Sequence, residues 1–314
     1  DGDASLSVTE TSEHVRVESG DVRYVFDPTD GALLAASVDG VDVLESGPEF
    51  DVWRPPTINE SAAFTPWCPE QISGWLELGL DDLSAIATDV TIDAADAERF
   101  ELAVDSFVSG PGTDAGFEVS TRYRVHPDGV VACAVEADPN GAFHEALEGW
   151  LPRMGVQFDV PRTLSTFEWY GRGPHESYPD RKESAHVDRH AGSVAEQIFP
   201  YCPPQAAGNK CDTRWASLAD DDGRGVVVFG ETPASVCLQP HENVHEAMYT
   251  HELRERETIG LDLDWRTAGV GGTPVPPLPE HRVPPEATAY SFGFRPLASG
   301  DDPMAVWRAA SDRL

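Results

Sequence analysis

The residues best suited to chemistry lie in the segment 169–215, which is rich in charged, aromatic and glycine residues. His175 and Glu176 are neighbours there, and imidazole and carboxyl groups are the usual agents of general acid–base catalysis. Their types alone make these two residues candidates for a catalytic role.

Other charged residues surround this pair. Arg172 stands between two glycines, and Glu176, Asp180 and Arg181 are close enough in the chain to form charge-assisted pairs with one another. Such a network suits either a loop that contacts a ligand or a rigid surface corner whose ions only hold its shape. We favour the rigid corner, because structural ion networks also produce such clusters.

Two pairs of histidines have the spacing of metal ligands on a helix. His186 and His190 are four residues apart, as are His241 and His245. Neither pair has a third ligand nearby or a glutamate in HExxH order, so surface histidines are favoured over a zinc site. We therefore predict no metal on this chain.

The cysteines indicate free thiols in a reducing compartment. They are odd in number, widely spaced and without a CxxC pair. The five are Cys68, Cys133, Cys202, Cys211 and Cys237.

The elements that must position these residues are short strands. Residues 119–125 and 130–137 flank a His-Pro-Asp-Gly turn at 126–129, in which proline presets the first dihedral and glycine takes the left-handed one. Short apolar alternation between turn signals recurs along the chain and predicts an all-β fold. Further strands are expected within 14–27, 32–43, 226–229, 258–265 and 288–295.

The chain reads as one large β-sandwich, because no low-complexity linker divides it. We expect the sandwich over residues 1–300 and a helical extension over 301–314. Asp302 and Pro303 supply a cap and a first-turn proline for this short helix, which runs through Trp307.

The charge excludes two classes of partner. The chain has 314 residues and a formal net charge of −33, which rules out a nucleic-acid or anionic-membrane binder. No apolar run reaches the roughly 20 residues of a membrane span, and no signal peptide opens the sequence. Because the acids spread along the whole chain and only two bases are lysines, we expect a cytoplasm of high salt concentration.

Motifs in three regions resemble a known family. Trp53 to Glu60 and the Gly269-Val270-Gly271-Gly272 turn match its first and last motifs, and Tyr249-Thr250-His251 carries a family histidine. The central motif consists of Trp169, Tyr170, Gly171, Arg172, Gly173, Pro174, Glu176, Tyr178, Asp180, Arg181, Gln205, Asn209, Asp212, Arg214 and Trp215. In this order, over about residues 5–297, they resemble the small chain or last domain of glycoside hydrolase family 2 β-galactosidases.

The resemblance implies a galactose-mutarotase-like supersandwich without catalytic residues of its own. In the family, the two glutamates that hydrolyse terminal β-D-galactosides lie on a separate (β/α)8 barrel, which needs about 250 residues and has no counterpart here. The implied partners are a catalytic barrel chain or upstream domains and a β-galactoside sugar, with no cofactor on this chain. The start at Asp1 instead of methionine also favours a part of a larger enzyme.

The resemblance further implies roles for individual residues. Asn59, Glu60, Gly271 and Gly272 would form a substrate-binding edge, with the loop to about residue 69 moving near the sugar, and the central motif residues and His251 would be mainly structural. The sequence departs from the family at 273–277, which has no aromatic residue to stack on the sugar, and at Ala206, where relatives have glutamate. Trp67 could take the place of this aromatic residue, but we favour a role for Trp67 as a buried core residue.

One alternative stays open. Mutarotases of related fold use a histidine and a carboxylate, so an autonomous carbohydrate-binding module or aldose-1-epimerase-like enzyme would use His175 and Glu176. Fold analogy alone supports this alternative. The missing barrel favours the other hypothesis, in which the chain is a part of a β-galactosidase.

Overall fold

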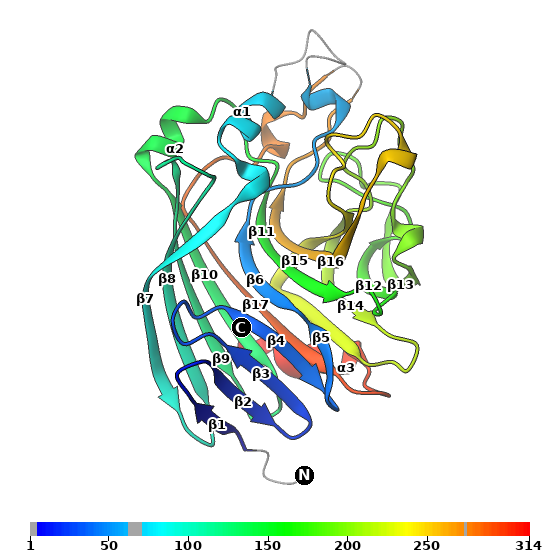
Figure 1. Cartoon of the computed structure of the whole chain (residues 1–314). Coiled ribbons are helices and arrows are strands. Elements are labelled where there is room, and N and C mark those ends of the chain that lie inside the picture. Colours follow the sequence, from blue (N-terminus) through cyan, green and yellow to red (C-terminus); the bar gives the residue numbers. More distant parts are fainter. Residues whose placement is uncertain (1–4, 62–70, 273–274) are drawn as a thin grey trace.

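The computed structural model describes residues 5–61, 71–272 and 275–314, and they form an antiparallel all-β fold (Figure 1). The prediction of an all-β sandwich is therefore confirmed. The strands are β1 (Ser7–Glu10), β2 (Val15–Ser19), β3 (Val22–Phe26), β4 (Leu33–Val38), β5 (Val41–Leu44), β6 (Ser46–Asp51), β7 (Ser84–Ala95), β8 (Phe100–Ser109), β9 (Gly116–Val125), β10 (Val131–Pro139), β11 (Arg153–Pro161), β12 (Thr166–Gly173), β13 (His186–Ser193), β14 (Lys210–Ala219), β15 (Gly225–His241), β16 (Glu255–Thr267) and β17 (Thr288–Leu297). The helices are α1 (Ile72–Glu77), α2 (Gly141–Ala146) and α3 (Pro303–Ala310), with 3₁₀ turns η1 (Ile58–Glu60), η2 (Leu80–Asp82), η3 (Ala195–Gln197), η4 (Thr250–Glu252), η5 (Pro279–His281) and η6 (Ser311–Arg313).

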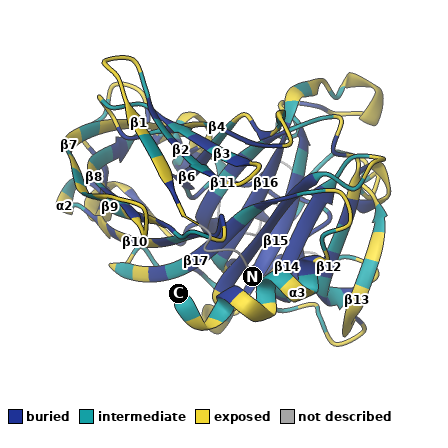
Figure 2. Ribbon diagram, turned by 90° about the horizontal axis from the view of Figure 1, so that it is seen from below, coloured by how far each residue is buried: buried dark blue, intermediate teal, exposed yellow. Residues whose placement is uncertain are grey.

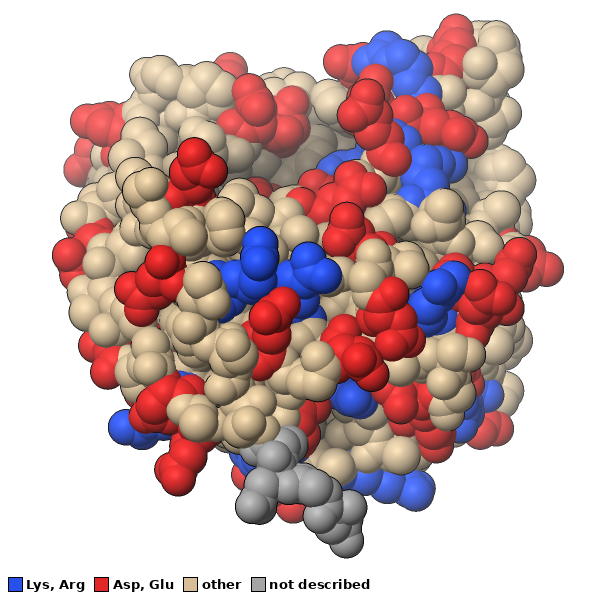
Figure 3. Space-filling model, turned by 60° about the horizontal axis from the view of Figure 1, so that its bottom comes forward, with Lys and Arg blue, Asp and Glu red and all other residues tan. Residues whose placement is uncertain are grey.

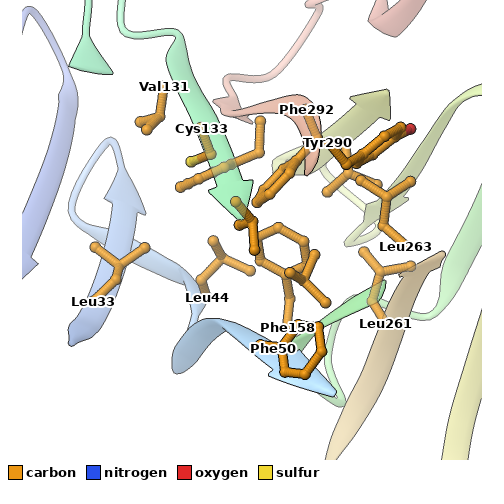
Figure 4. Close-up of a cluster of buried hydrophobic side chains, with 14 of the residues drawn as sticks. Leu33, Leu44, Phe50, Val131, Cys133, Phe158, Leu261, Leu263, Tyr290 and Phe292 are labelled. Atoms are coloured by element: carbon orange, nitrogen blue, oxygen red, sulfur yellow. The ribbon is translucent and has the colours of Figure 1, made fainter. Parts of the chain in front are cut away.

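Two sheets enclose the core. A large sheet has the order β13-β12-β14-β15-β17-β10-β9-β8-β7, with β16, β11 and β6 branching from β15, and a smaller sheet has the order β1 to β5. Figure 4 shows Leu33 and Leu44 of the smaller sheet opposite Phe158 and Phe292 of the large one. Burial of these apolar side chains between the two sheets stabilises the sandwich.

The predicted hairpin is confirmed. β9 and β10 pair from Val131 with Val125 onward, and Gly129 in the turn has φ of +76°. The other predicted strands correspond to β2 to β5, β15, β16 and β17.

The motif segment was expected to be a loop, and this prediction is wrong for its first part. Residues 169–173 belong to β12, which pairs with β13 and β14. Gly171 is close to the neighbouring strand, since a Cβ there would lie 2.3 Å from Thr213 Oγ1. The glycines that suggested a loop therefore permit close strand packing.

The C-terminal helix is confirmed. The Asp302 side chain accepts a hydrogen bond from the Met304 amide, and Pro303 occupies the first turn of α3. Ala310 and Trp307 pack with Trp215 on the outer face of the large sheet. Figure 2 shows that exposed residues gather on the loops and on β13, whereas β14 and β15 are largely buried. None of the described helices has the length and apolarity needed to cross a bilayer.

Candidate functional site

Motif segments far apart in the sequence meet at one place, which we call the motif junction: residues 54–60, 176–181, 205–209 and 269–272. The Asn59 amide nitrogen donates to the carbonyl oxygen of Val270 (2.8 Å). The Ile58 backbone amide donates to Gln205 Oε1 (3.1 Å), so three of the segments are joined directly. Asn59 Oδ1 is buried and has no hydrogen-bond partner within the described residues.

Asp180 anchors the glycine turn of the junction. Its two carboxylate oxygens accept hydrogen bonds from the backbone amides of Val270 (3.0 Å) and Gly271 (2.7 Å). A Cβ at Gly269 would lie 2.5 Å from Asp180 Cγ, so only glycine fits there. The expected ion pair between Asp180 and Arg181 is wrong, because Asp180 uses both oxygens on the backbone of residues 270 and 271.

Glu176 holds the next part of the junction. Its carboxylate accepts from Arg181 (2.6 Å), from the Tyr201 hydroxyl (2.5 Å) and from the Gly208 amide (2.9 Å). The predicted pair of Glu176 with Arg181 is thus present. Burial and the Glu176 carboxylate raise the pKa of Tyr201.

His175 does not act together with Glu176 in this arrangement. The exposed His175 ring contacts the Ser184 hydroxyl, with Nε2 2.9 Å from Oγ. Glu176 meanwhile is committed to the partners described above. The two side chains that the mutarotase-like alternative requires therefore contact different groups.

A buried ion pair lies beneath the Asn59 turn. Arg54 donates twice to the Glu60 carboxylate (2.9 and 2.7 Å), and the Thr57 amide adds a third hydrogen bond (2.7 Å). Glu60 is 0% exposed, so its carboxylate lies inside the fold. The family resemblance implies a position at the substrate edge for Glu60, and its pairing with Arg54, six residues earlier, was not predicted.

The remaining central residues brace β12 and β14. Arg172 pairs with Asp212 and donates to the carbonyl oxygens of Lys182 and Ala185 (3.0 and 2.8 Å). Burial alone would raise the pKa of Asp212, but hydrogen bonds from Arg172 and Lys182 outweigh it and lower that pKa.

Aromatic rings of the motif pack against cations. Lys210 Nζ lies 4.7 Å from the centroid of the buried Trp169 ring, and burial lowers the pKa of Lys210 to about 8. Arg214 lies over Tyr170 at 5.5 Å. At the end of β12, Gly173 is buried and Pro174 is exposed. Tyr178 and Trp215 are buried. The Asn209 amide nitrogen donates to the Ser177 carbonyl oxygen.

His251, expected to be mainly structural, lies at the surface. Its exposed ring stacks on Tyr249 at 5.6 Å, and within the described ranges its side chain makes no hydrogen bond. Gly271 has φ of +66°, and Gly272 donates to the Val275 carbonyl oxygen (2.9 Å). Trp67, Cys68, most of the loop to residue 69 and residues 273–274 lie outside the described residues.

The histidine pairs do not lie on helices, since His241 is the last residue of β15 and the other pair belongs to β13. His186 and His190 lie on β13 with ring centroids 5.2 Å apart, and His245 packs against Trp53. In the described part of the chain, no three His, Cys, Asp or Glu side chains form a group that would hold a metal ion. The four described cysteines, at 133, 202, 211 and 237, are free thiols.

A second buried ion cluster was missed by the sequence analysis. Arg153, 1% exposed, contacts Asp51, Asp262 (3.1 Å) and Asp264 (2.5 Å). Burial, with Asp262 nearby, raises the pKa of Asp264 to about 7 in spite of Arg153. Asp262 and Asp264 alternate with Leu261 and Leu263 along β16, a pattern typical of acids that face solvent, so nothing in the sequence indicated their burial.

An apolar pocket of about 430 Å³ adjoins the junction. Pro55 and Gln205 form the wall that it shares with the Asn59 turn, and Tyr201, Leu238 and Ile259 also line it. The fold and the junction together define an antiparallel β-sandwich domain with one edge fixed by its motifs.

Comparison with known proteins assigns this domain to a family. The chain belongs to the beta-galactosidase small chain family, whose model matches residues 18–295. The beta-galactosidase of Priestia megaterium is 27% identical, over 85% of this chain and 25% of the relative. The beta-galactosidase of Kluyveromyces lactis is 26% identical, over 91% of this chain and 28% of the relative. The resemblance to the small chain of β-galactosidases is confirmed, and the chain spans about a quarter of the length of these relatives.

Among solved structures, a galactose 1-epimerase from Lactobacillus acidophilus NCFM is similar in fold. The TM-score is 0.43 and the identity 10%, and the match covers 93% of this chain and 98% of the epimerase.

Proposed function

We propose that this chain is a non-catalytic but required part of a β-galactosidase that hydrolyses terminal β-D-galactosides. The catalytic glutamates would lie on a barrel, either in a partner chain or in upstream domains. The family match over residues 18–295 carries this proposal, together with relatives of which the match covers only about a quarter.

The role of the chain in this proposal is to complete the edge of the active site. Asn59 and Gly271 are held against each other through Val270 and Asp180, so one rigid unit would present the turns at 59 and 271–272 to the sugar. Glu60 would support this edge from inside, through Arg54. The central motif residues would hold the junction in shape, and no residue of this chain would take part in bond breaking.

We place the enzyme in a cytoplasm of high salt concentration. The net charge of −33 and the free thiols support this location. Residues 1–300 would form the sandwich, and residues 301–314 an extension whose helix packs on its outer face.

Complementation tests this function. The purified chain alone should not cleave nitrophenyl galactoside, and mixing it with a catalytic large chain that lacks this part should restore hydrolysis. Asn59→Ala should weaken the restored activity, because it removes the contact to Val270. Thr91→Ala is the control, because Thr91 lies on β7, an edge strand of the large sheet that is not part of the junction. This variant should restore the same activity as the wild-type chain. Hydrolysis or accelerated galactose anomer exchange by the chain alone would overturn the proposal.

A further inference from the structure

A second pocket, of about 420 Å³, gathers basic side chains in this acidic molecule. It lies where β16 ends beside the 3₁₀ turn η5. Its basic side chains are Lys182, Arg266, His281 and Arg282, and its carboxylates are Asp212 and Glu280. The proposed β-galactosidase function uses neither of its arginines, Arg266 and Arg282.

Two guanidinium groups in this pocket have no carboxylate partner among the described residues. In that part of the structure, 14 of the 20 arginines form an ion pair. Within the described residues, the six without one are Arg16, Arg122, Arg214, Arg266, Arg282 and Arg308. Two of these six, Arg266 and Arg282, line the same pocket. In a chain with 55 acids, unpaired arginines that share a pocket require an explanation.

Arg282 is held in place without being neutralised. Its Nε donates to the Pro277 carbonyl oxygen (2.9 Å), and its guanidinium carbon lies 4.5 Å from the centroid of the Trp150 ring. Both contacts orient the side chain and leave its positive charge uncompensated. An oriented guanidinium loses less rotamer freedom when it binds a ligand.

The acids of the pocket do not cancel this charge. Asp212 is engaged by Arg172 and by Lys182, whose Nζ lies 3.1 Å from its nearer oxygen. The group of Arg172, Lys182 and Asp212 carries one net positive charge. Glu280 forms no ion pair within the described ranges. Its negative charge offsets that of only one of the two arginines, so the pocket keeps an excess of positive charge.

The charge of the whole molecule does not prevent an anion from binding here. Acidic side chains are scattered over the face shown in Figure 3, with basic ones between them. Their repulsion acts over long range and is screened within about 8 Å at physiological ionic strength. Hydrogen bonds from guanidinium groups act at contact distance and persist.

We propose that this pocket binds a small oxyanion, a phosphate or carboxylate group, through Arg266 and Arg282. The planar guanidinium donates two parallel hydrogen bonds to such groups. The volume accommodates a metabolite of several carbon atoms that carries the anionic group. The pocket adjoins the motif junction at Pro179, but Arg266 and Arg282 lie outside the junction, and the proposal does not depend on the proposed function.

Isothermal titration with inorganic phosphate and with citrate tests the proposal, in an amine buffer at fixed KCl concentration. We expect saturable binding of one ion per chain; phosphate alone would identify a phosphoryl ligand and citrate alone a carboxylate. Arg266→Gln should weaken binding about tenfold, since one charged donor is lost. Arg308→Gln, an exposed arginine on α3 that also lacks an ion pair, is the matched control and should bind as wild type does.

Circular dichroism checks that Arg266→Gln folds, which its exposure makes the expected result. Arg282→Lys keeps the charge but loses the bidentate geometry, and it should also bind more weakly. Absence of binding by both ions, or equal affinities of Arg266→Gln and wild type, would overturn the proposal.

Discussion

Acidic residues of this chain have two distinct environments. Most face solvent, but Glu60 is fully buried and neutralised by Arg54, and Asp262 and Asp264 share Arg153 inside the sandwich. Breaking a buried pair by removing one partner is costly, because the other charge stays buried and uncompensated.

Glu60→Gln should therefore destabilise the fold strongly. The Arg54 guanidinium would remain buried without a counter-charge, and we expect a loss of about 3–5 kcal/mol in the free energy of unfolding. Urea denaturation at constant salt measures it. Glu242→Gln is the control, because Glu242 pairs with Arg254 on the surface, where both side chains are more than half exposed, and it should cost less than about 1 kcal/mol. A similar loss in the two variants would contradict this account.

At this scale, the sequence indicated which residues matter but not what they contact. The pair of Glu176 with Arg181 was predictable because the two lie close in the chain. The contact of Asp180 with the Val270 amide was not, because 90 residues separate them and only the fold brings them together. A buried carboxylate needs a partner, because an unpaired buried charge is costly. The burial of Glu60 was not visible in the sequence, so its pairing with Arg54 could not be predicted.

The glycine turn depends on close contact between elements. β16 leads directly into residues 268–272, and the Asp180 carboxylate fills the space beside Gly269. The junction is thus held by a side chain from one segment against the backbone of another.

Gly269→Ala should disrupt this contact. The added Cβ would lie 2.5 Å from Asp180 Cγ, so the carboxylate must move away from the Val270 and Gly271 amides, at a cost of about 2 kcal/mol or more. Thermal melting measures the loss. Gly74→Ala in α1 is the matched control, since its Cβ would meet nothing within 4 Å, and it should be neutral or stabilise by up to about 1 kcal/mol. If Gly269→Ala melted like Gly74→Ala, the anchoring role of Asp180 would be wrong.

Strands were predictable where one face is buried. β2 and β3 alternate strictly between buried and partly buried residues, and the sequence revealed both. β7 was missed although Val90 and Ile92 alternate with polar residues in its second half, because the strand is largely exposed and its first half shows no such alternation. β12 was missed because glycines occupy two of its buried positions.

For the whole molecule, the charge of −33 opposes the compact state. Self-repulsion among surface acids lowers stability in dilute buffer, and salt of about 1 M shortens the screening length to about 3 Å.

We expect the melting temperature to rise substantially from dilute buffer to concentrated KCl. Circular dichroism measures it, and the same fold and melting point under both conditions would contradict the expectation. Neutralising the exposed acids Asp93 and Glu98 by amide substitution should reduce this dependence on salt, because fewer like charges would remain.

The position of β17 has a consequence for how the chain is made. This strand is among the last elements in the sequence, yet it lies between β10 and β15 and pairs with both. Until a ribosome has produced residues 288–297, the edges of β10 and β15 that β17 covers stay open, and open edges are templates for aggregation. Folding by such distant pairings is also slow. Synthesis that stops before residue 288 therefore yields an aggregation-prone fragment and not a shorter working domain.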